Sequence, residues 1–319
     1  MEKSRTSVDH QPSYLVLYHK GILAARVEEL SARLACCDLC PRRCGVNRNA
    51  GQMGSCGVGP DPKVAAMSIH QWEEPPISGT RGSGTIFFSG CTLKCVFCQN
   101  YPISQLGVGR SITIEELAEG MMSLQKRGAH NINLVTPTHQ MAAVAQAVLI
   151  AIPRGLRLPI VYNSSGFESL ETLRLLDGIV DIYLPDMKYS DSQVARFCSG
   201  RGDYVEHNRR ALVEMWRQVG NLRMDDQSMA YRGVLIRHLV LPGGLSGTRS
   251  SFSFLADRLG LDVWVSVMNQ YFPAHKAHRL PPLDRKILRE EYEAAFRILD
   301  ELGLKNGFVQ TYPDDEEDL

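Results

Sequence analysis

Six short apolar runs with helix-like segments between them constrain the fold of this 319-residue chain more than any other feature. The runs are 85–88, 132–135, 159–162, 179–184, 234–241 and 263–267. Helical spacing or capping signals lie between most of them, as in the capping box Thr113–Glu116. Strands joined by helices are typical of a parallel sheet with right-handed connections. Six strands are too few for a closed eight-stranded barrel, so the sequence predicts an α/β fold, a partial (β/α)6 barrel.

Polar residues follow each predicted strand. In parallel barrels the reactive groups gather at the carboxyl ends of the strands, where the loops converge. The predicted strand ends are a cysteine loop, Thr136–His139, Asn163–Gly166, Asp186–Lys188, Arg237 with His238, and Asn269–Tyr271. We therefore expect these side chains to meet at one rim of the barrel.

The cysteine loop follows the first strand and contains Cys91, Cys95 and Cys98. Thiolates bind iron in Fe–S clusters, and a [4Fe–4S] cluster has four irons to satisfy. Three cysteines leave one iron without a protein ligand, and an open coordination position is typical of a reactive metal centre. The alternatives are a fragment of a zinc site and incidental thiols.

The pattern Cys-x3-Cys-x2-Cys, with Phe97 before the last cysteine, resembles the signature of the radical S-adenosylmethionine (radical SAM) superfamily. The resemblance implies that the open iron chelates S-adenosylmethionine, and that one electron cleaves it to methionine and a 5′-deoxyadenosyl radical. It also implies a reductant protein of the flavodoxin or ferredoxin type. Cys91, Cys95 and Cys98 are then both the metal ligands and the catalytic residues.

S-adenosylmethionine has a carboxylate, an amine and two ribose hydroxyls that a protein must hold. Lys188 suits the carboxylate as a compact positive charge. Asn163, Asp186 and His238 suit the hydroxyls or the amine as hydrogen-bonding groups. Phe97 either packs on the adenine or fills the core.

The stretch from about Cys37 to Val309 also resembles uncharacterised proteins close to the pyruvate formate-lyase activating enzymes. The segments that carry this resemblance are 37–46, 74–80, 89–101, 184–189 and 236–243. It implies that the radical takes hydrogen from a backbone glycine of a partner protein, and that Asp186 and Lys188 form a cofactor-binding element. A small-molecule substrate is the alternative within this chemistry, and a non-catalytic metal–sulfur electron carrier or scaffold protein is the alternative outside it.

One turn departs from the activating enzymes. They carry Gly-Gly-Glu after the second strand to hold the methionine amine, whereas this chain has Thr136-Pro-Thr-His139. Thr138 and His139 are the substitutes that the sequence offers for that contact.

A second group of cysteines precedes the barrel. Leu23, Val27, Leu30 and Leu34 predict an amphipathic helix that leads into it. Cys37, Cys40, Cys44 and Cys56 predict a four-thiolate site for structural zinc or an auxiliary Fe–S cluster, since tetrahedral sulfur sites serve both metals. Thiols that bind no metal, or that are redox-active, are the alternative.

These features divide the chain into four predicted parts. They are a flexible arm (1–17), a helix plus Cys-rich metal-binding extension (18–75), a radical SAM partial barrel (76–311) and an acidic tail (312–319). The boundary near residue 75 falls in a connection rich in glycine, proline and serine, 61–84.

Charge and hydropathy exclude several classes of partner. The 35 basic and 35 acidic side chains balance, which gives no reason to expect a nucleic acid or an anionic membrane surface. The longest apolar run, 141–152, is far below the roughly 20 residues that cross a bilayer. The first thirty residues lack a secretion signal, so we expect a cytoplasmic protein whose clustered cysteines serve metal rather than disulfides, with Cys198 apart from them as a small hydrophobic residue.

Overall fold

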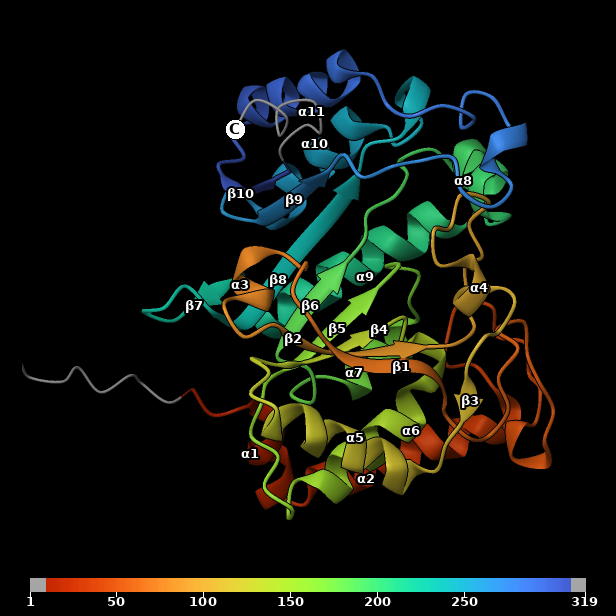
Figure 1. The fold of residues 1–319 in the computed structure, drawn as a ribbon, viewed down its shortest axis with the longest axis vertical. Helices are drawn as coiled ribbons and strands as arrows, with labels where there is room; N and C mark the ends of the chain where they lie inside the picture. Colours follow the sequence, from red (N-terminus) through yellow and green to blue (C-terminus); the bar gives the residue numbers. More distant parts are fainter. Residues whose placement is uncertain (1–9, 311–319) are drawn as a thin grey trace, which may run out of the picture.

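One sheet of ten strands organises the part of the chain that the computed structural model describes, residues 10–310 (Figure 1). Seven strands run parallel, in the spatial order β10-β9-β8-β6-β5-β4-β2. Their bounds in chain order are β2 Ser83–Phe88, β4 Ile132–Val135, β5 Ile160–Ser164, β6 Ile182–Pro185, β8 Ala230–Leu239, β9 Trp264–Met268 and β10 Asn306–Val309. Antiparallel strands β1 (Lys63–His70) and β3 (Arg110–Ser111) extend the β2 edge, and β7 (Arg223–Met224) pairs with β8.

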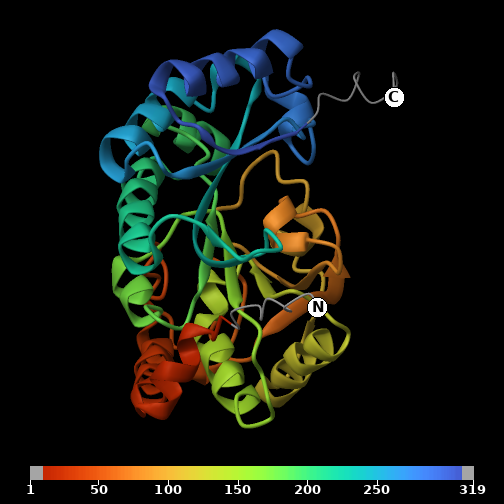
Figure 2. The same cartoon turned by 90° about the vertical axis from the view of Figure 1, so that its left-hand side faces the viewer.

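Helices cover the outer face of the curved sheet, while α3 lies on its inner side (Figures 1 and 2). The helices are α1 Ser13–His19, α2 Ile22–Ala32, α3 Pro75–Ser78, α4 Tyr101–Ser104, α5 Ile114–Lys126, α6 Met141–Ala151, α7 Leu170–Leu175, α8 Ser192–Ser199, α9 Tyr204–Val219, α10 Thr248–Leu259 and α11 Arg289–Leu302. The predicted capping box at Thr113 opens α5, and Gly303 ends α11 in a left-handed conformation. Short 3-10 turns fill several of the remaining connections.

Alternation along the strands separates two apolar layers. Residues such as Leu134, Tyr162 and Ile236 face the helices and belong to the main core. The intervening residues face inward, where Val161, Ile182, Leu184 and Leu235 pack with Ile77 of α3. Helix α3 therefore closes one end of the partial barrel with a layer of apolar side chains, which we call the barrel floor. The inward-facing positions beyond this layer can carry polar groups.

The predicted α/β fold with a parallel sheet is confirmed. All six predicted strands are present as β2, β4, β5, β6, β8 and β9. The prediction of six parallel strands was one short, because β10 was missed. This strand has four residues, begins Asn-Gly and lies at a partly exposed edge, so it carries little of the apolar alternation that identifies a strand.

The amino-terminal prediction was correct for one helix and wrong for another segment. Helix α2 buries Leu23, Val27 and Leu30, as its spacing predicted. Residues 13–17 of the predicted flexible arm instead belong to α1, where the Tyr14 hydroxyl donates to the carbonyl of Leu158 at 2.9 Å. The rest of the arm up to residue 9 and the acidic tail 312–319 lie outside the described residues.

The predicted connection 61–84 was also wrong in part. Strand β1 occupies 63–70 and pairs with β2 from Val64 opposite Phe88 to His70 opposite Ser83. Its register shifts between Val64 and Ala66, and every residue of β1 except Val64 is at least partly exposed, which hides the strand pattern in the sequence. The sheet thus continues across the boundary predicted near residue 75, although the division into domains stays a prediction.

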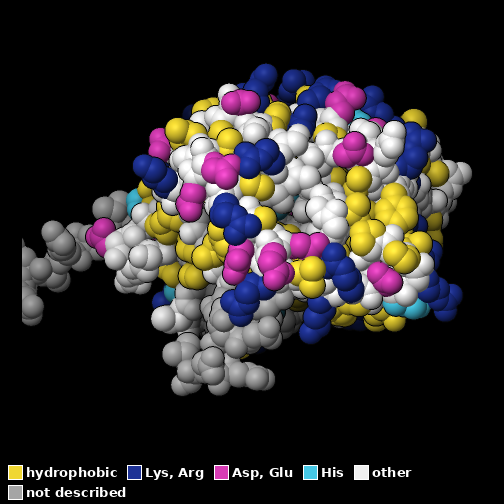
Figure 3. All heavy atoms as spheres, turned by 90° about the horizontal axis from the view of Figure 1, so that it is seen from above, with side chains coloured by type: hydrophobic (Ala, Val, Ile, Leu, Met, Phe, Trp, Pro, Cys, Tyr) yellow, Lys and Arg dark blue, Asp and Glu magenta, His cyan; other side chains and the backbone are white. Residues whose placement is uncertain are grey.

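Two surface properties complete the fold. Within residues 10–310, every helix is too short or too polar to cross a membrane. Basic and acidic side chains are interspersed on the face seen in Figure 3, as the balanced composition suggests. The cytoplasmic location stays a prediction.

Replacing Leu23 with alanine tests whether the leading helix belongs to the same cooperative core. Leu23 is fully buried, so Leu23→Ala should lower the free energy of unfolding by about 2–5 kcal/mol in urea denaturation. Ile22→Ala, at the partly exposed neighbouring position, should cost less than about 1 kcal/mol. Equal losses in the two variants would contradict the packing described here.

Candidate active site

The three thiols of the cysteine loop lie close together directly after β2. Burial, with a smaller contribution from the neighbouring thiols, raises the pKa of Cys91 and raises that of Cys95 to about 12. Two of the sulfurs accept hydrogen bonds: the Leu93 amide of the loop donates to Cys91 Sγ at 3.3 Å, and the Tyr189 hydroxyl, which follows β6, donates to Cys95 Sγ at 3.6 Å. Cys98 Sγ lies 3.2 Å from the Ser104 hydroxyl.

These thiols fit an Fe–S cluster. A buried thiol with a pKa near 12 stays protonated at neutral pH unless a metal takes the place of the proton. In a cubane each cysteine binds a different iron, so the sulfurs surround the cluster instead of meeting at one point.

The Cys-rich extension that precedes the barrel, residues 18–75 and here called the leader, packs directly against the cysteine loop. Gly90 has a φ of +83°, and a Cβ there would lie 2.4 Å from the Cys56 carbonyl oxygen, so only glycine fits under the leader. Arg42 donates to the carbonyls of Thr92 and Leu93 within the loop. The leader therefore contacts the loop through the Cys56 carbonyl and the Arg42 side chain.

The four leader cysteines lie near one another, but they do not form a site for one ion. Burial raises the pKa of Cys37 and raises that of Cys40 to about 12, and nearby Cys44 and Cys56 add to these respective shifts. A structural zinc needs four sulfurs at about 2.3 Å from one point. No such convergence is present in the described part of the chain, so the zinc prediction for Cys37, Cys40, Cys44 and Cys56 gains no support.

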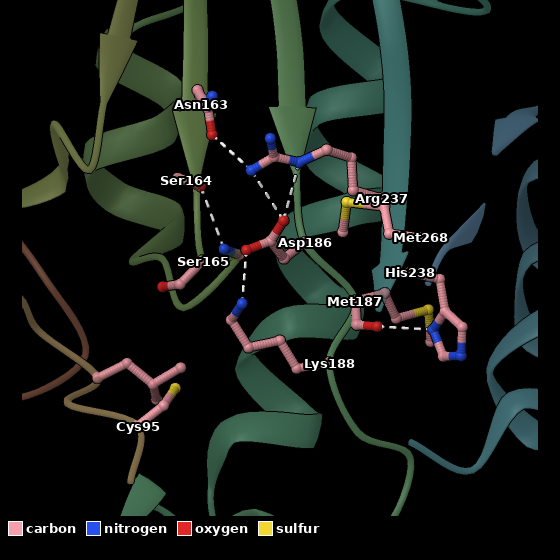
Figure 4. Close-up of polar contacts among 12 residues, drawn as sticks. Cys95, Asn163, Ser164, Ser165, Asp186, Met187, Lys188, Arg237, His238 and Met268 are labelled. Atoms are coloured by element: carbon pink, nitrogen blue, oxygen red, sulfur yellow. Dashed lines mark hydrogen bonds and ion pairs between the residues drawn. The ribbon is translucent and has the colours of Figure 1, made fainter. Parts of the chain in front are cut away.

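A network of charges lies at the ends of β5, β6 and β8, facing the cysteine loop (Figure 4). Asp186, directly after β6, is its centre. Its carboxylate accepts a hydrogen bond from Lys188 Nζ at 2.6 Å and another from Arg237 Nε at 2.9 Å. Arg237 also donates to Asn163 Oδ1 at 2.6 Å. Three neighbouring strands thus bring together three of the predicted cofactor-binding residues, Asn163, Asp186 and Lys188.

The network fixes the charge of its members. Burial alone would raise the pKa of Asp186, but Arg237 and Lys188 outweigh it and hold that pKa below its usual value. Burial opposes the charge of Lys188, and the Asp186 carboxylate outweighs it, so the pKa of Lys188 is raised. Asp186 is therefore anionic and Lys188 cationic at neutral pH. Cys95 adds to the raised pKa of Lys188, which places this lysine at the cluster end of the network.

His238 lies on the opposite face of β8 from Arg237. Its Nδ1 lies 2.8 Å from the Met187 carbonyl and its Nε2 lies 3.0 Å from the Thr248 hydroxyl. The ring packs edge-on against Phe252 and points away from Asp186 (Figure 4). The structure therefore does not bring His238 together with the other predicted cofactor-binding residues.

Phe97 is buried in an aromatic cluster. Its ring meets those of Tyr189 and Tyr271 edge-on, with centroids 6.4 and 5.7 Å apart, and only 5% of the residue is exposed. It fills the core, which was one of its two predicted roles.

Thr138 and His139 are also buried and point away from the network. The Thr138 hydroxyl donates to Glu168 at 2.8 Å, and His139 Nε2 lies 2.8 Å from the Ser89 carbonyl. Burial lowers the pKa of His139 to about 4, so the ring is neutral and supports the cysteine loop. Their contact with the methionine amine stays a prediction, as do the roles of the other site residues.

Two residues of the network were not assigned by sequence. Arg237 was placed at a strand end without a role, and Glu73 was assigned to an irregular connection. Glu73 Oε2 lies 3.5 Å from Arg237 Nη1, and Glu73 Oε1 accepts from Asn163 Nδ2 at 3.4 Å. Arg237 was placed correctly at the end of a strand, but the sequence of β8 does not tell that Arg237 faces inward and His238 outward, and Glu73 reaches the site through tertiary structure that no local pattern encodes.

Comparison with known proteins gives one family. The family model described as the radical SAM superfamily matches residues 85–239. The uncharacterized protein MJ0674 of Methanocaldococcus jannaschii is 30% identical over 293 residues, which is 89% of this chain and 80% of that protein.

Two solved structures are similar to this chain at low sequence identity. A radical SAM methyltransferase from Sphaerobacter thermophilus is 15% identical with a TM-score of 0.48, over 95% of this chain and 94% of that chain. The hydrogenase maturase HydG from Carboxydothermus hydrogenoformans is 14% identical with a TM-score of 0.45, over 72% of this chain. The matched region spans about half of HydG, 53% of its chain.

A methyl group at Gly90 should disturb the cysteine loop. Gly90→Ala combines a strained left-handed φ with the close Cys56 carbonyl, so we expect less iron and sulfide per protein after anaerobic reconstitution. Gly57→Ala is the matched control, because Gly57 has a similar φ of +76° with nothing within 4 Å of the added Cβ. It should cost only about 1–2 kcal/mol of stability and keep its iron. Full iron in Gly90→Ala would show that the leader does not constrain the loop.

Proposed function

This chain belongs to the radical SAM superfamily, and we propose that it is an enzyme that cleaves S-adenosylmethionine at Cys91, Cys95 and Cys98 to abstract hydrogen from a substrate. The single observation that carries the proposal is the pairing of this three-thiol loop with the Asp186–Lys188 charge network on the facing strand ends. The loop suits a cluster with one open iron, and the network suits the charged and hydroxylated parts of the cofactor.

Each part of the chain has a task in this proposal. Cys91, Cys95 and Cys98 bind the [4Fe–4S] cluster, and the Leu93 amide and Tyr189 hydroxyl stabilise the thiolates. Lys188 binds the cofactor carboxylate, while Asp186 and Asn163 accept and donate hydrogen bonds to its hydroxyls. A [4Fe–4S] cluster held by these three cysteines would supply the electron for reductive cleavage of S-adenosylmethionine, with a flavodoxin- or ferredoxin-type protein as the reductant.

We propose a protein substrate, with hydrogen taken from a backbone glycine as in the pyruvate formate-lyase activating enzymes. The support is the local resemblance at 89–101 and 184–189, which includes the Asp186-x-Lys188 element. A small-molecule substrate is the second candidate, favoured by the different turn at Thr136–His139. A leader that holds an auxiliary cluster at Cys37, Cys40, Cys44 and Cys56 is compatible with either substrate.

Cofactor cleavage is the first test. The protein, reconstituted anaerobically with iron and sulfide and reduced with dithionite, should convert S-adenosylmethionine to 5′-deoxyadenosine and methionine, both measured by chromatography. Cys95→Ala should abolish the product because it removes one cluster ligand. Cys36→Ala, an exposed cysteine outside both groups, should retain it. A fully loaded wild-type cluster that yields no 5′-deoxyadenosine would refute the proposed activity.

The source of the abstracted hydrogen separates the two substrate classes. A lysate from cells of the source organism grown in deuterium oxide is divided by dialysis into macromolecules and small molecules, and each fraction is added to the reaction. Mass spectrometry should find deuterium in 5′-deoxyadenosine with the macromolecular fraction. Deuterium transfer from the dialysed small molecules alone would replace the protein substrate with a small one.

A further inference from the structure

The charge network continues from Arg237 toward the apolar floor of the barrel. Glu73 and Glu74 precede α3, and both carboxylates act on Arg237, whose pKa they help to raise. The Glu73 side chain is only 10% exposed, and that of Arg237 is 15% exposed. This end of the network therefore borders the barrel interior, while Lys188 marks the end beside Cys95.

A buried amide without partners lies beside these carboxylates. Ile132 and Leu134 face the helices, so the alternation of β4 turns Asn133 inward. Strand pairing places Asn133 opposite Val161 and Val135 opposite Asn163, so Asn133 lies one inward layer below Asn163. Burial raises the pKa of the neighbouring Glu73 carboxyl, and Asn133 lies close enough to oppose that shift, although neither polar atom of its amide meets hydrogen-bond geometry.

Three buried polar atoms here have no hydrogen-bond partner among residues 10–310. They are Nδ2 and Oδ1 of Asn133, which is 0% exposed, and Oε2 of Glu74. Buried polar groups are normally paired, so unpaired ones on one interior surface indicate a place for water or a ligand. An amide offers both a donor and an acceptor, and the carboxylate offers an acceptor.

The charges at this surface do not balance. Three carboxylates, Asp186, Glu73 and Glu74, face the two cations Lys188 and Arg237. Asp186 is shared between both cations, so Glu74 keeps a carboxylate oxygen that no cation of the described chain contacts. This region therefore holds more carboxylates than cations, which disfavours an anionic ligand and favours a cation. Burial raises the pKa of Glu73, and a bound cation would offset that effect.

We infer that Glu73, Glu74 and Asn133 form a substrate subsite that binds a cationic nitrogen group, an ammonium or a guanidinium. The inference rests on the proposed function and adds the chemical class of the group next to the reacting position. Arg237 separates this subsite from Lys188, so the cofactor lies at the cluster end and the substrate cation lies at the floor end.

Calorimetric titration with a matched pair of probes tests the subsite. The reconstituted enzyme with bound S-adenosylmethionine is titrated with n-butylguanidinium and with the neutral isostere n-butylurea. The cation should bind about tenfold more tightly, the effect of one hydrogen bond to a charged group. Equal binding of the two probes, or no binding of the cation, would overturn the inference.

Variants locate the bound cation. Glu74→Gln should weaken n-butylguanidinium binding about tenfold, and Asn133→Leu should weaken both probes. Glu28→Gln, which removes the same charge from an exposed position on α2, should change nothing. If Asn133→Leu fails to fold or loses its iron, the comparison of Glu74→Gln with Glu28→Gln decides alone. Equal weakening in those two variants would assign the binding to general surface charge.

A titration without S-adenosylmethionine separates the substrate from the cofactor. The subsite predicts that the two bind together, so the cofactor should not weaken n-butylguanidinium binding. Competition would assign the carboxylates to the cofactor amine and end the inference. None of these titrations requires cleavage of S-adenosylmethionine. The enzyme can therefore form 5′-deoxyadenosine without binding the cation, and it can bind the cation without forming 5′-deoxyadenosine.

Discussion

The Asp186 carboxylate, held between Lys188 and Arg237, is the interaction on which the site depends. It joins the end of β6 to β8 and fixes a cation toward the cysteine loop and another toward the barrel floor. A mostly buried carboxylate with two cations is stable only as a set, because removing one member leaves the others without compensation. The parallel register of β6 and β8 pairs Asp186 with Arg237, and on β5 Asn163 lies one inward layer below them, opposite Leu184.

Much of the fold was readable from sequence because its signals are local. Apolar runs, the capping box at Thr113 and the glycine after α11 each identify an element by its own residues. Strand β10 was missed because an edge strand is stabilised by pairing with its neighbour and needs no strong pattern of its own. Strand β1, between β2 and the short β3, was missed because a register shift and partly exposed residues obscure its alternation. The fully buried Tyr14 and Leu15 show why the arm was misjudged: a short helix forms there because the rest of the protein covers it.

The site was predictable where chemistry and spacing coincide. The spacing of Cys91, Cys95 and Cys98 identified the cysteine loop, and the position of Asp186 and Lys188 after a strand identified them as site residues. His238 illustrates the limit, because adjacent residues of a strand face opposite ways and the apolar neighbours Leu235 and Ile236 do not tell which way is inward. The position of Glu73 could not be predicted from the sequence, since it lies between β1 and α3, and only the folded chain brings it to Arg237.

The cysteine loop also contacts a segment that lies far from it in the sequence. Gln99 Nε2 donates to the Gln270 carbonyl at 2.7 Å across 171 residues of sequence, and the Lys276 amide donates to Val96 at 2.9 Å. During synthesis the ribosome therefore releases the three thiols long before the segment that covers them exists. Until that segment is made, the nascent loop is open to oxidation, and early cluster insertion would protect it.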